Sequence, residues 1–156
     1  MRYLNKIVFI NSAAIRYSEV QLDGNIHLIG TQGVGKSTIL RAILFFYNAD
    51  TQRLGIPVEK KSYQDYYFPY ADSSIIYEVA REDGWFTVLS YKTMNRICYR
   101  FIASPYRPDL FIDEEGAPYP SDRIRSVLDK NGIKYSGAIS TYEEYRNILY
   151  LSLIHI

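Results

Sequence analysis

The stretch GTQGVGKST, residues 30–38, fits the pattern G-x-x-x-x-G-K-[ST] of a phosphate-binding loop. A polyphosphate is bound when several backbone N–H groups point at one spot, and glycine is favoured where a side chain would block that approach. Lys36 supplies a cation for the β- and γ-phosphates, and the hydroxyl of Ser37 is suited to Mg²⁺. The stretch therefore predicts a nucleotide site made of consecutive residues, with Ser37 as the metal ligand: Gly30, Thr31, Gln32, Gly33, Val34, Gly35, Lys36, Ser37 and Thr38.

The chain on either side supplies the strand and the helix that such a loop requires. NIHLIG, residues 25–30, is a short apolar run typical of a buried strand. KSTILRAILFFYN, residues 36–48, repeats apolar residues at helical spacing. The N–H groups and the positive dipole end of that helix would face the same phosphates. We therefore expect ATP and Mg²⁺ as ligands.

Composition limits the kind of protein. A chain of 156 residues, 47% of them hydrophobic, suggests one domain or part of one. The net charge of +1 gives no overall basic field that would indicate nucleic acid. Cys98 is the single cysteine, so a disulfide within the chain is excluded, which fits a reducing cytosol. Residues 1–20 resemble neither a signal peptide nor a membrane span, so we expect a cytoplasmic protein without a membrane segment.

The rest of the chain predicts strands around the loop and its helix. Residues 4–11 and 15–22 show strand patterns, and Asp23-Gly24 predicts a tight turn. KKSYQDYYFPYADSS, residues 60–74, is interpreted as a surface loop. Three further strands are expected, the first two joined at Asp83-Gly84: 74–83, 84–93 and 96–104. The chain has 16 tyrosines, which would either stack on bases or fill half-buried strands; their strand-like positions favour the second explanation.

The C-terminal third predicts two helices. Residues 109–119 indicate a short strand that enters a turn. Residues 121–133 form a helical pattern with Ser121 as N-cap and Gly132 as its stop, and Thr141 begins a second helix. This order predicts an α/β fold of the P-loop NTPase type, with a mixed β-sheet, an antiparallel meander and the P-loop helix. It lacks the regular strand–helix alternation of a small nucleotide kinase.

One acidic segment raises an alternative. A P-loop ATPase needs an acidic residue at the end of a buried strand to hold Mg²⁺, and usually a carboxylate beside it to position water. LFIDEE, residues 110–115, would supply Asp113 and Glu114 for these roles. Gly116 and Pro118 follow at once, so the segment is better interpreted as a hairpin tip. A compact, self-sufficient P-loop NTPase or kinase that uses Asp113 remains the alternative.

The N-terminal order of motifs resembles the ATPase heads of structural-maintenance-of-chromosomes (SMC) type proteins, the group that includes MukB and SbcC. The resemblance lies in a strand ending at Asn11, a second strand to Leu22, and then NIHLIGTQGVGKSTILRAILFFY, with Gln32 where the group usually has Asn. FIDEEGAPY and SDRIRSVLDKNGI, residues 111–119 and 121–133, look similar to later parts of the same lobe. The chain also resembles the condensin-like ATP-binding component of Wadjet-type plasmid-defence systems.

This resemblance implies that residues 1–150 are the N-terminal, ATP-binding lobe of an ABC/SMC-type head. It implies as partners a C-terminal lobe of the same protein, a second head joined through ATP, and DNA in the intact complex. The intact protein would be an ATPase, whereas this lobe would bind ATP without turnover. A module that holds nucleotide only as a structural or regulatory ligand is a further possibility. The last six residues, LSLIHI, read as a translated sequencing adaptor, so residues 151–156 are expected to be non-native and to break the helix before them.

Two features depart from that group. A glutamine that contacts Mg²⁺ and the attacking water is expected just after residues 131–140, but Ser140 and Thr141 stand there. The basic residue often found shortly before the P-loop strand has Arg16 as its nearest candidate.

Overall fold

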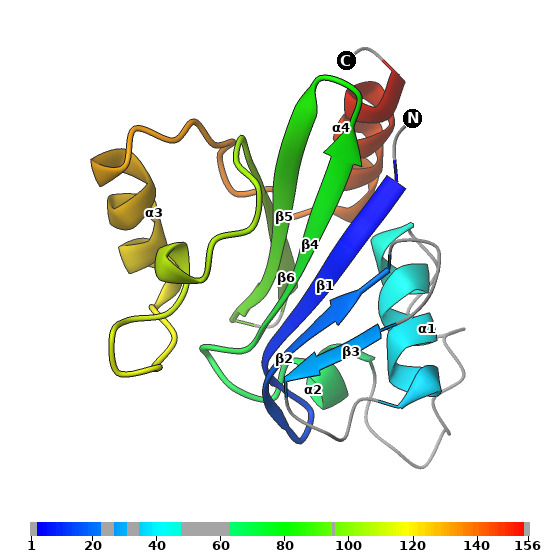
Figure 1. The fold of residues 1–156 in the computed structure, drawn as a ribbon, viewed down its shortest axis with the longest axis vertical. Coiled ribbons are helices and arrows are strands. Elements are labelled where there is room, and N and C mark those ends of the chain that lie inside the picture. The colour runs from blue at the N-terminus through cyan, green and yellow to red at the C-terminus, as the bar shows by residue number, and fades with distance from the viewer. Residues whose placement is uncertain (1–2, 23–26, 31–34, 48–62, 95, 155–156) are drawn as a thin grey trace.

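The computed structural model describes residues 3–22, 27–30, 35–47, 63–94 and 96–154, with the backbone alone for 27–30, 63–64 and 151–154 (Figure 1). Its strands form one six-stranded sheet in the order β3-β2-β1-β4-β5-β6. The strands are β1 (Tyr3–Ser12), β2 (Ile15–Gln21), β3 (His27–Gly30), β4 (Ser74–Arg81), β5 (Gly84–Thr93) and β6 (Arg96–Ile102). The helices are α1 (Lys36–Phe46), α2 (Tyr63–Tyr67), a 3₁₀ turn (Pro108–Leu110), α3 (Ser121–Lys130) and α4 (Tyr142–Ile154).

Every pairing between the described strands is antiparallel, so these strands do not form the mixed sheet that the sequence predicted. The reason is the connections. Parallel neighbours need a crossover of about a dozen residues or more, whereas only two residues separate the strands in each of the pairs β1–β2, β4–β5 and β5–β6. Gly84, at the predicted Asp83-Gly84 turn, has φ +146°, a conformation that glycine adopts readily.

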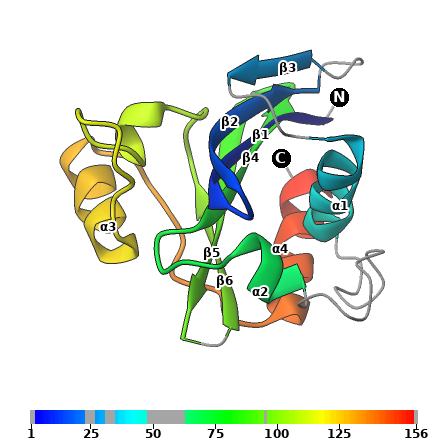
Figure 2. The same cartoon turned by 90° about the horizontal axis from the view of Figure 1, so that it is seen from below.

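The sheet carries helices on both faces (Figures 1 and 2). Because side chains alternate along a strand, β1 serves both cores. Ile7 and Phe9 belong to the core that contains residues of α1 and α4. Val8 and Ile10 belong to the core that contains Leu110, Phe111 and residues of α3. Helix α1 therefore lies on the opposite face from the segment that carries Asp113.

Most of the predicted elements are confirmed within a few residues. Thr141 caps α4, since its Oγ1 accepts the N–H of Glu144 over 3.3 Å, and Gly132 ends α3 with φ +67°. Pro120, rather than Ser121, is the N-cap of α3, and Ser121 is its first residue. Cys98 is buried in the second core. The predicted Asp23-Gly24 turn lies outside the described residues.

Three predictions were wrong. The expected strand within 109–119 is the 3₁₀ turn followed by a single bridge between Ile112 and Pro118, because Pro108 and the Asp113 turn leave no room for a ladder. The expected surface loop at 60–74 contains α2, and both Tyr67 and Phe68 are 0% exposed. The backbone of residues 151–154 continues α4 instead of breaking it.

Tyrosines are built into the cores, as their strand-like positions suggested. Six of them are buried in the described part of the chain: Tyr67, Tyr77, Tyr91, Tyr99, Tyr106 and Tyr145. Three tyrosine hydroxyls donate to backbone carbonyls of α1, those of Tyr77 to Ala42 (2.8 Å), Tyr142 to Phe45 (3.1 Å) and Tyr145 to Phe46 (2.6 Å). Of the helices that the structure describes, none is both long and apolar enough to span a lipid bilayer.

Candidate functional site

The predicted strand and helix are present on either side of residues 31–34. Gly30 is the last residue of β3 and pairs with Ser18 of β2, and α1 begins at Lys36. Gly30 and Gly35 to Thr38 can thus be placed, whereas Thr31, Gln32, Gly33 and Val34 lie outside the described residues. Because β3 and β2 are antiparallel, β3 ends at the side of the sheet where β1 turns into β2 (Figure 1).

The backbone N–H groups in the first turn of α1 have no acceptor within the helix. Gly35 is the N-cap, with φ −82° and ψ 168°, and its lack of a side chain means that it offers no capping oxygen. The first backbone bond within the helix runs from the N–H of Ile39 to the carbonyl of Gly35, over 3.2 Å. A Cβ added at Gly35 would meet nothing within 4 Å, so no described residue fills the space beside this glycine. The N–H groups of Lys36, Ser37 and Thr38 are consequently free of helical acceptors, as at other helix starts.

The charges of α1 run against its dipole. Lys36 occupies the first position and Arg41 the second turn, while the first turn has no acidic residue and the last turn no basic one. Cations near the positive N-terminus of a helix are unfavourable by about 0.3–1 kcal/mol each unless an anion compensates them. Lys36 and Ser37 are exposed. Within the described chain neither side chain has a hydrogen-bond or ion-pair partner. The first turn of α1 thus carries a cation at its positive end with no acidic residue to compensate it.

Tyr67, at the end of α2, connects this helix start to the sheet. Its carbonyl accepts the hydroxyl of Ser12 over 2.7 Å. Its hydroxyl accepts from Nη1 of Arg41 over 3.2 Å and lies 3.4 Å from Oγ1 of Thr38. Sequence reasoning missed this residue because α2 has only five residues, YQDYY, too few to show a helical period.

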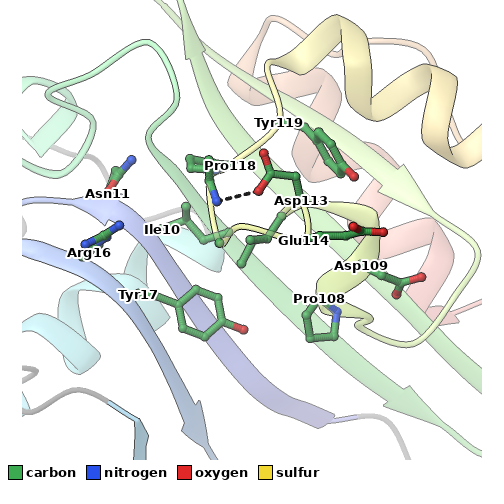
Figure 3. Close-up of a pocket in the computed structure, with 13 residues that line it drawn as sticks. Ile10, Asn11, Arg16, Tyr17, Pro108, Asp109, Asp113, Glu114, Pro118 and Tyr119 are labelled. Carbon is green, nitrogen blue, oxygen red and sulfur yellow. Dashed lines mark hydrogen bonds between the residues drawn. The ribbon is translucent and has the colours of Figure 1, made fainter.

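Asp113 is placed in a turn, as the hairpin-tip interpretation predicted. Its Oδ1 accepts the N–H groups of Glu115 and Ala117, each over 2.9 Å, and its carbonyl accepts from Gly116 over 3.0 Å. Asp113 lines a cleft of about 910 Å³ that Arg16 and other residues of the β1–β2 region also line (Figure 3).

This cleft involves the sheet face of α3, while Ser37 belongs to the helix on the other face. The sheet thus separates Asp113 from Ser37, the residue with which the alternative would have it share Mg²⁺. The geometry argues against the alternative of a compact NTPase that uses Asp113 and Glu114.

The metal-binding set is incomplete in the described part of the chain. No group of three or more His, Cys, Asp or Glu residues is gathered there in a way that could hold a metal ion. Ser140 and Thr141, at the position expected for a glutamine, are exposed at the start of α4. Arg16, the nearest candidate for the basic residue before the loop, is exposed at the cleft of Asp113. Ser37 is therefore the single predicted Mg²⁺ ligand that these residues offer.

The described residues form an α/β domain in which the sequence GTQGVGKST stands between β3, at the edge of the described antiparallel sheet, and α1. The chain belongs to the family described as "Protein of unknown function (DUF3584)", whose model matches residues 11–151. The match spans β2, the phosphate loop, α1 and most of α4. No curated protein and no solved structure matches the chain.

Proposed function

We propose that the loop at residues 30–38 and the start of α1 bind the phosphates of ATP together with Mg²⁺. The observation that carries this proposal is the cationic first turn of α1, where Lys36 and the helix dipole coincide with N–H groups that no described side chain caps, and where no carboxylate is present. An ordinary strand-to-helix turn would be stabilised by Ser, Thr, Asp or Asn at the N-cap and by an acid in the first turn. This chain has neither.

Each residue has a separate role in the proposed site. The N–H groups of Lys36 to Thr38 donate to phosphate oxygens, and the Lys36 ammonium neutralises charge on the β- and γ-phosphates. The Ser37 hydroxyl coordinates Mg²⁺. The motif assigns the remaining backbone donors to residues 31–34.

We further propose that the chain is the N-terminal lobe of an SMC-type head. Two observations support a lobe that is completed by other parts. First, β3, which leads into the phosphate loop, is at the edge of the described sheet. An edge strand presents unpaired N–H and C=O groups, which another strand can satisfy. Second, the described residues beside Ser37 supply no acidic metal ligand. In this proposal a C-terminal lobe of the same protein supplies both.

The intact protein would then use ATP to join two heads, and would act on DNA. ATP hydrolysis would release the heads, since the γ-phosphate is part of the contact. Adding the C-terminal lobe distinguishes this proposal from a module that only retains nucleotide. ATP hydrolysis should begin on that addition if the chain is part of an SMC-type head, and should stay absent if it is such a module.

Calorimetry with Mg-ATP on the 156-residue chain tests the phosphate site. We expect binding by the wild-type chain and a loss of at least about tenfold in affinity for Lys36→Ala, because the phosphates lose a charge-assisted donor. Lys130→Ala is the matched control: Lys130 is an exposed lysine in the last turn of α3, on the other face of the sheet. Equal affinity of the Lys36 variant and the wild-type chain would exclude the proposed site.

A further inference from the structure

We infer that Tyr67 is a positioning residue of the phosphate site, which orients the hydroxyl of Thr38 so that it donates to a phosphate oxygen. This inference rests on the proposed nucleotide binding. Thr38 directly follows Ser37 in the first turn of α1, where the free N–H groups are found. Its hydroxyl is thus within the part of the helix that would face the ligand.

The direction of the hydrogen bonds follows from what each group can do. A guanidinium has donors and no acceptor, so the Tyr67 oxygen must accept at its 3.2 Å contact with Nη1 of Arg41. The hydroxyl hydrogen of Tyr67 can then be donated to Oγ1 of Thr38, 3.4 Å away. Thr38, as acceptor from Tyr67, keeps its own hydrogen for another acceptor. Arg41, Tyr67 and Thr38 therefore form a hydrogen-bond relay, in which each group donates to the next and the Thr38 hydroxyl donates to the anion.

Each hydrogen bond in this relay strengthens the next one. A donor that is itself polarised by a cation makes a better hydrogen bond, and the effect is larger where water is excluded. Tyr67 is 0% exposed, so its hydroxyl is shielded in this way. The charge of Arg41, one turn further along α1, thereby strengthens the hydrogen bond from Thr38 to a ligand.

The position of Tyr67 is fixed from outside α1. Its carbonyl is held by the hydroxyl of Ser12, a buried residue at the end of β1, and its ring packs edge-on against Tyr66 with centroids 4.8 Å apart. Phe68, which follows it, is also fully buried. The sheet therefore holds the Tyr67 hydroxyl in place before a ligand arrives, which is the condition for preorganised binding.

A purely structural role for Tyr67 would have a different signature. Tyr77 provides the comparison, because its hydroxyl also anchors α1 but donates to the carbonyl of Ala42, beyond the first turn. Tyr77 is 1% exposed. Removing either hydroxyl should cost stability, whereas only the Tyr67 hydroxyl should influence nucleotide affinity.

The experiment measures nucleotide affinity by calorimetry on the 156-residue chain, with Mg-ATP and with ADP in EDTA. We expect Tyr67→Phe and Thr38→Val each to weaken binding by about threefold to tenfold, the value of one hydrogen bond. The double variant should lose no more than either single variant, and Thr38→Ser should retain wild-type affinity. Tyr77→Phe should bind like the wild-type chain.

Magnesium separates this role from that of Ser37. The loss caused by Tyr67→Phe should persist in EDTA, because the relay acts on phosphate directly, while the loss caused by Ser37→Ala should disappear without the metal. Wild-type affinity of Tyr67→Phe, or additive losses in the double variant, would overturn the inference and leave the proposed function standing. Absence of binding by the wild-type chain would overturn both. Should Tyr67→Phe fail to fold, Arg41→Met tests the relay from its other end, and wild-type affinity of that variant would equally overturn it.

Discussion

The hydroxyl of Tyr145 in α4 donates to the carbonyl oxygen of Phe46, the last residue of α1, over 2.6 Å. The last carbonyls of a helix have no partners within it. Tyr142 supplies a second bond of the same kind to the carbonyl of Phe45. The helix that follows the phosphate loop is thus capped at its C-terminus by two tyrosines from a helix near the other end of the chain.

Tyr145→Phe should destabilise the fold by about 1–2 kcal/mol, because it leaves the buried Phe46 carbonyl without its donor and adds no steric change. Urea unfolding followed by far-UV circular dichroism measures this difference. Tyr70→Phe is the control, since the side chain of Tyr70 is 59% exposed. A loss as small as that of the control would show that water replaces the Tyr145 hydroxyl.

Asp113→Asn should leave the affinity for Mg-ATP within about threefold of wild type, a difference of about 0.7 kcal/mol. The Asp113 carboxylate accepts backbone N–H groups within its own turn, and an asparagine carbonyl can do the same. Calorimetry with and without Mg²⁺ is the measurement. Loss of Mg²⁺-dependent binding, with the circular dichroism spectrum intact, would restore the compact-NTPase alternative.

The 156-residue chain should hydrolyse ATP negligibly, because the described residues offer no carboxylate beside Ser37 to complete a metal site or to orient water. Phosphate release by the purified chain is the assay, with Lys36→Ala as the control for a contaminating ATPase. A wild-type turnover near 1 s⁻¹ or above is about the lower end of ordinary enzyme rates. If Lys36→Ala abolished this turnover, the result would mean that the site is already complete. The split-head proposal would then be withdrawn.

The stability of the chain should fall as the pH rises from about 10 to about 12. Burial, the largest cause, raises the pKa of Tyr17 to about 12 from its ordinary 10.0, with Glu19 adding to the rise and the hydrogen bond from Tyr106 opposing it. The folded state therefore holds the Tyr17 proton more tightly than the unfolded state, so stability is complete below pH 10 and is lost through this window. Burial also raises the pKa values of Tyr99, Tyr106 and Tyr145, so they act in the same direction.

Urea unfolding at several pH values checks this. The Tyr17→Phe variant should show a shallower decline than the wild-type chain between pH 10 and 12. An identical decline in both would mean that Tyr17 does not contribute to it.

Local signals in the sequence predicted most of the elements but not how they meet. The start of α1 and the Asp83-Gly84 hairpin were predictable because a few adjacent residues determine each of them. The pairing of β1 with β4, in which Ile10 is opposite Ser74, depends on residues far apart in the chain and left no local pattern. The contacts of the Tyr67 hydroxyl with Thr38 and Arg41 likewise join residues far apart in the chain, and the five residues of α2 are too few to show a helical period.

The pairing of β1 with β4 also determines when the proposed phosphate site can form during folding. The β4–β5–β6 meander is built from consecutive residues, whereas β1 can join β4 only by closing a long loop of chain, at a cost in entropy. The whole phosphate loop lies inside that closed loop. Nucleotide binding should therefore be acquired last, after the meander. Stopped-flow refolding can follow both events, with Trp85, the single tryptophan, reporting the β4–β5 hairpin and a fluorescent nucleotide reporting the site. Equal rates for the two signals would show that the chain folds in one concerted step.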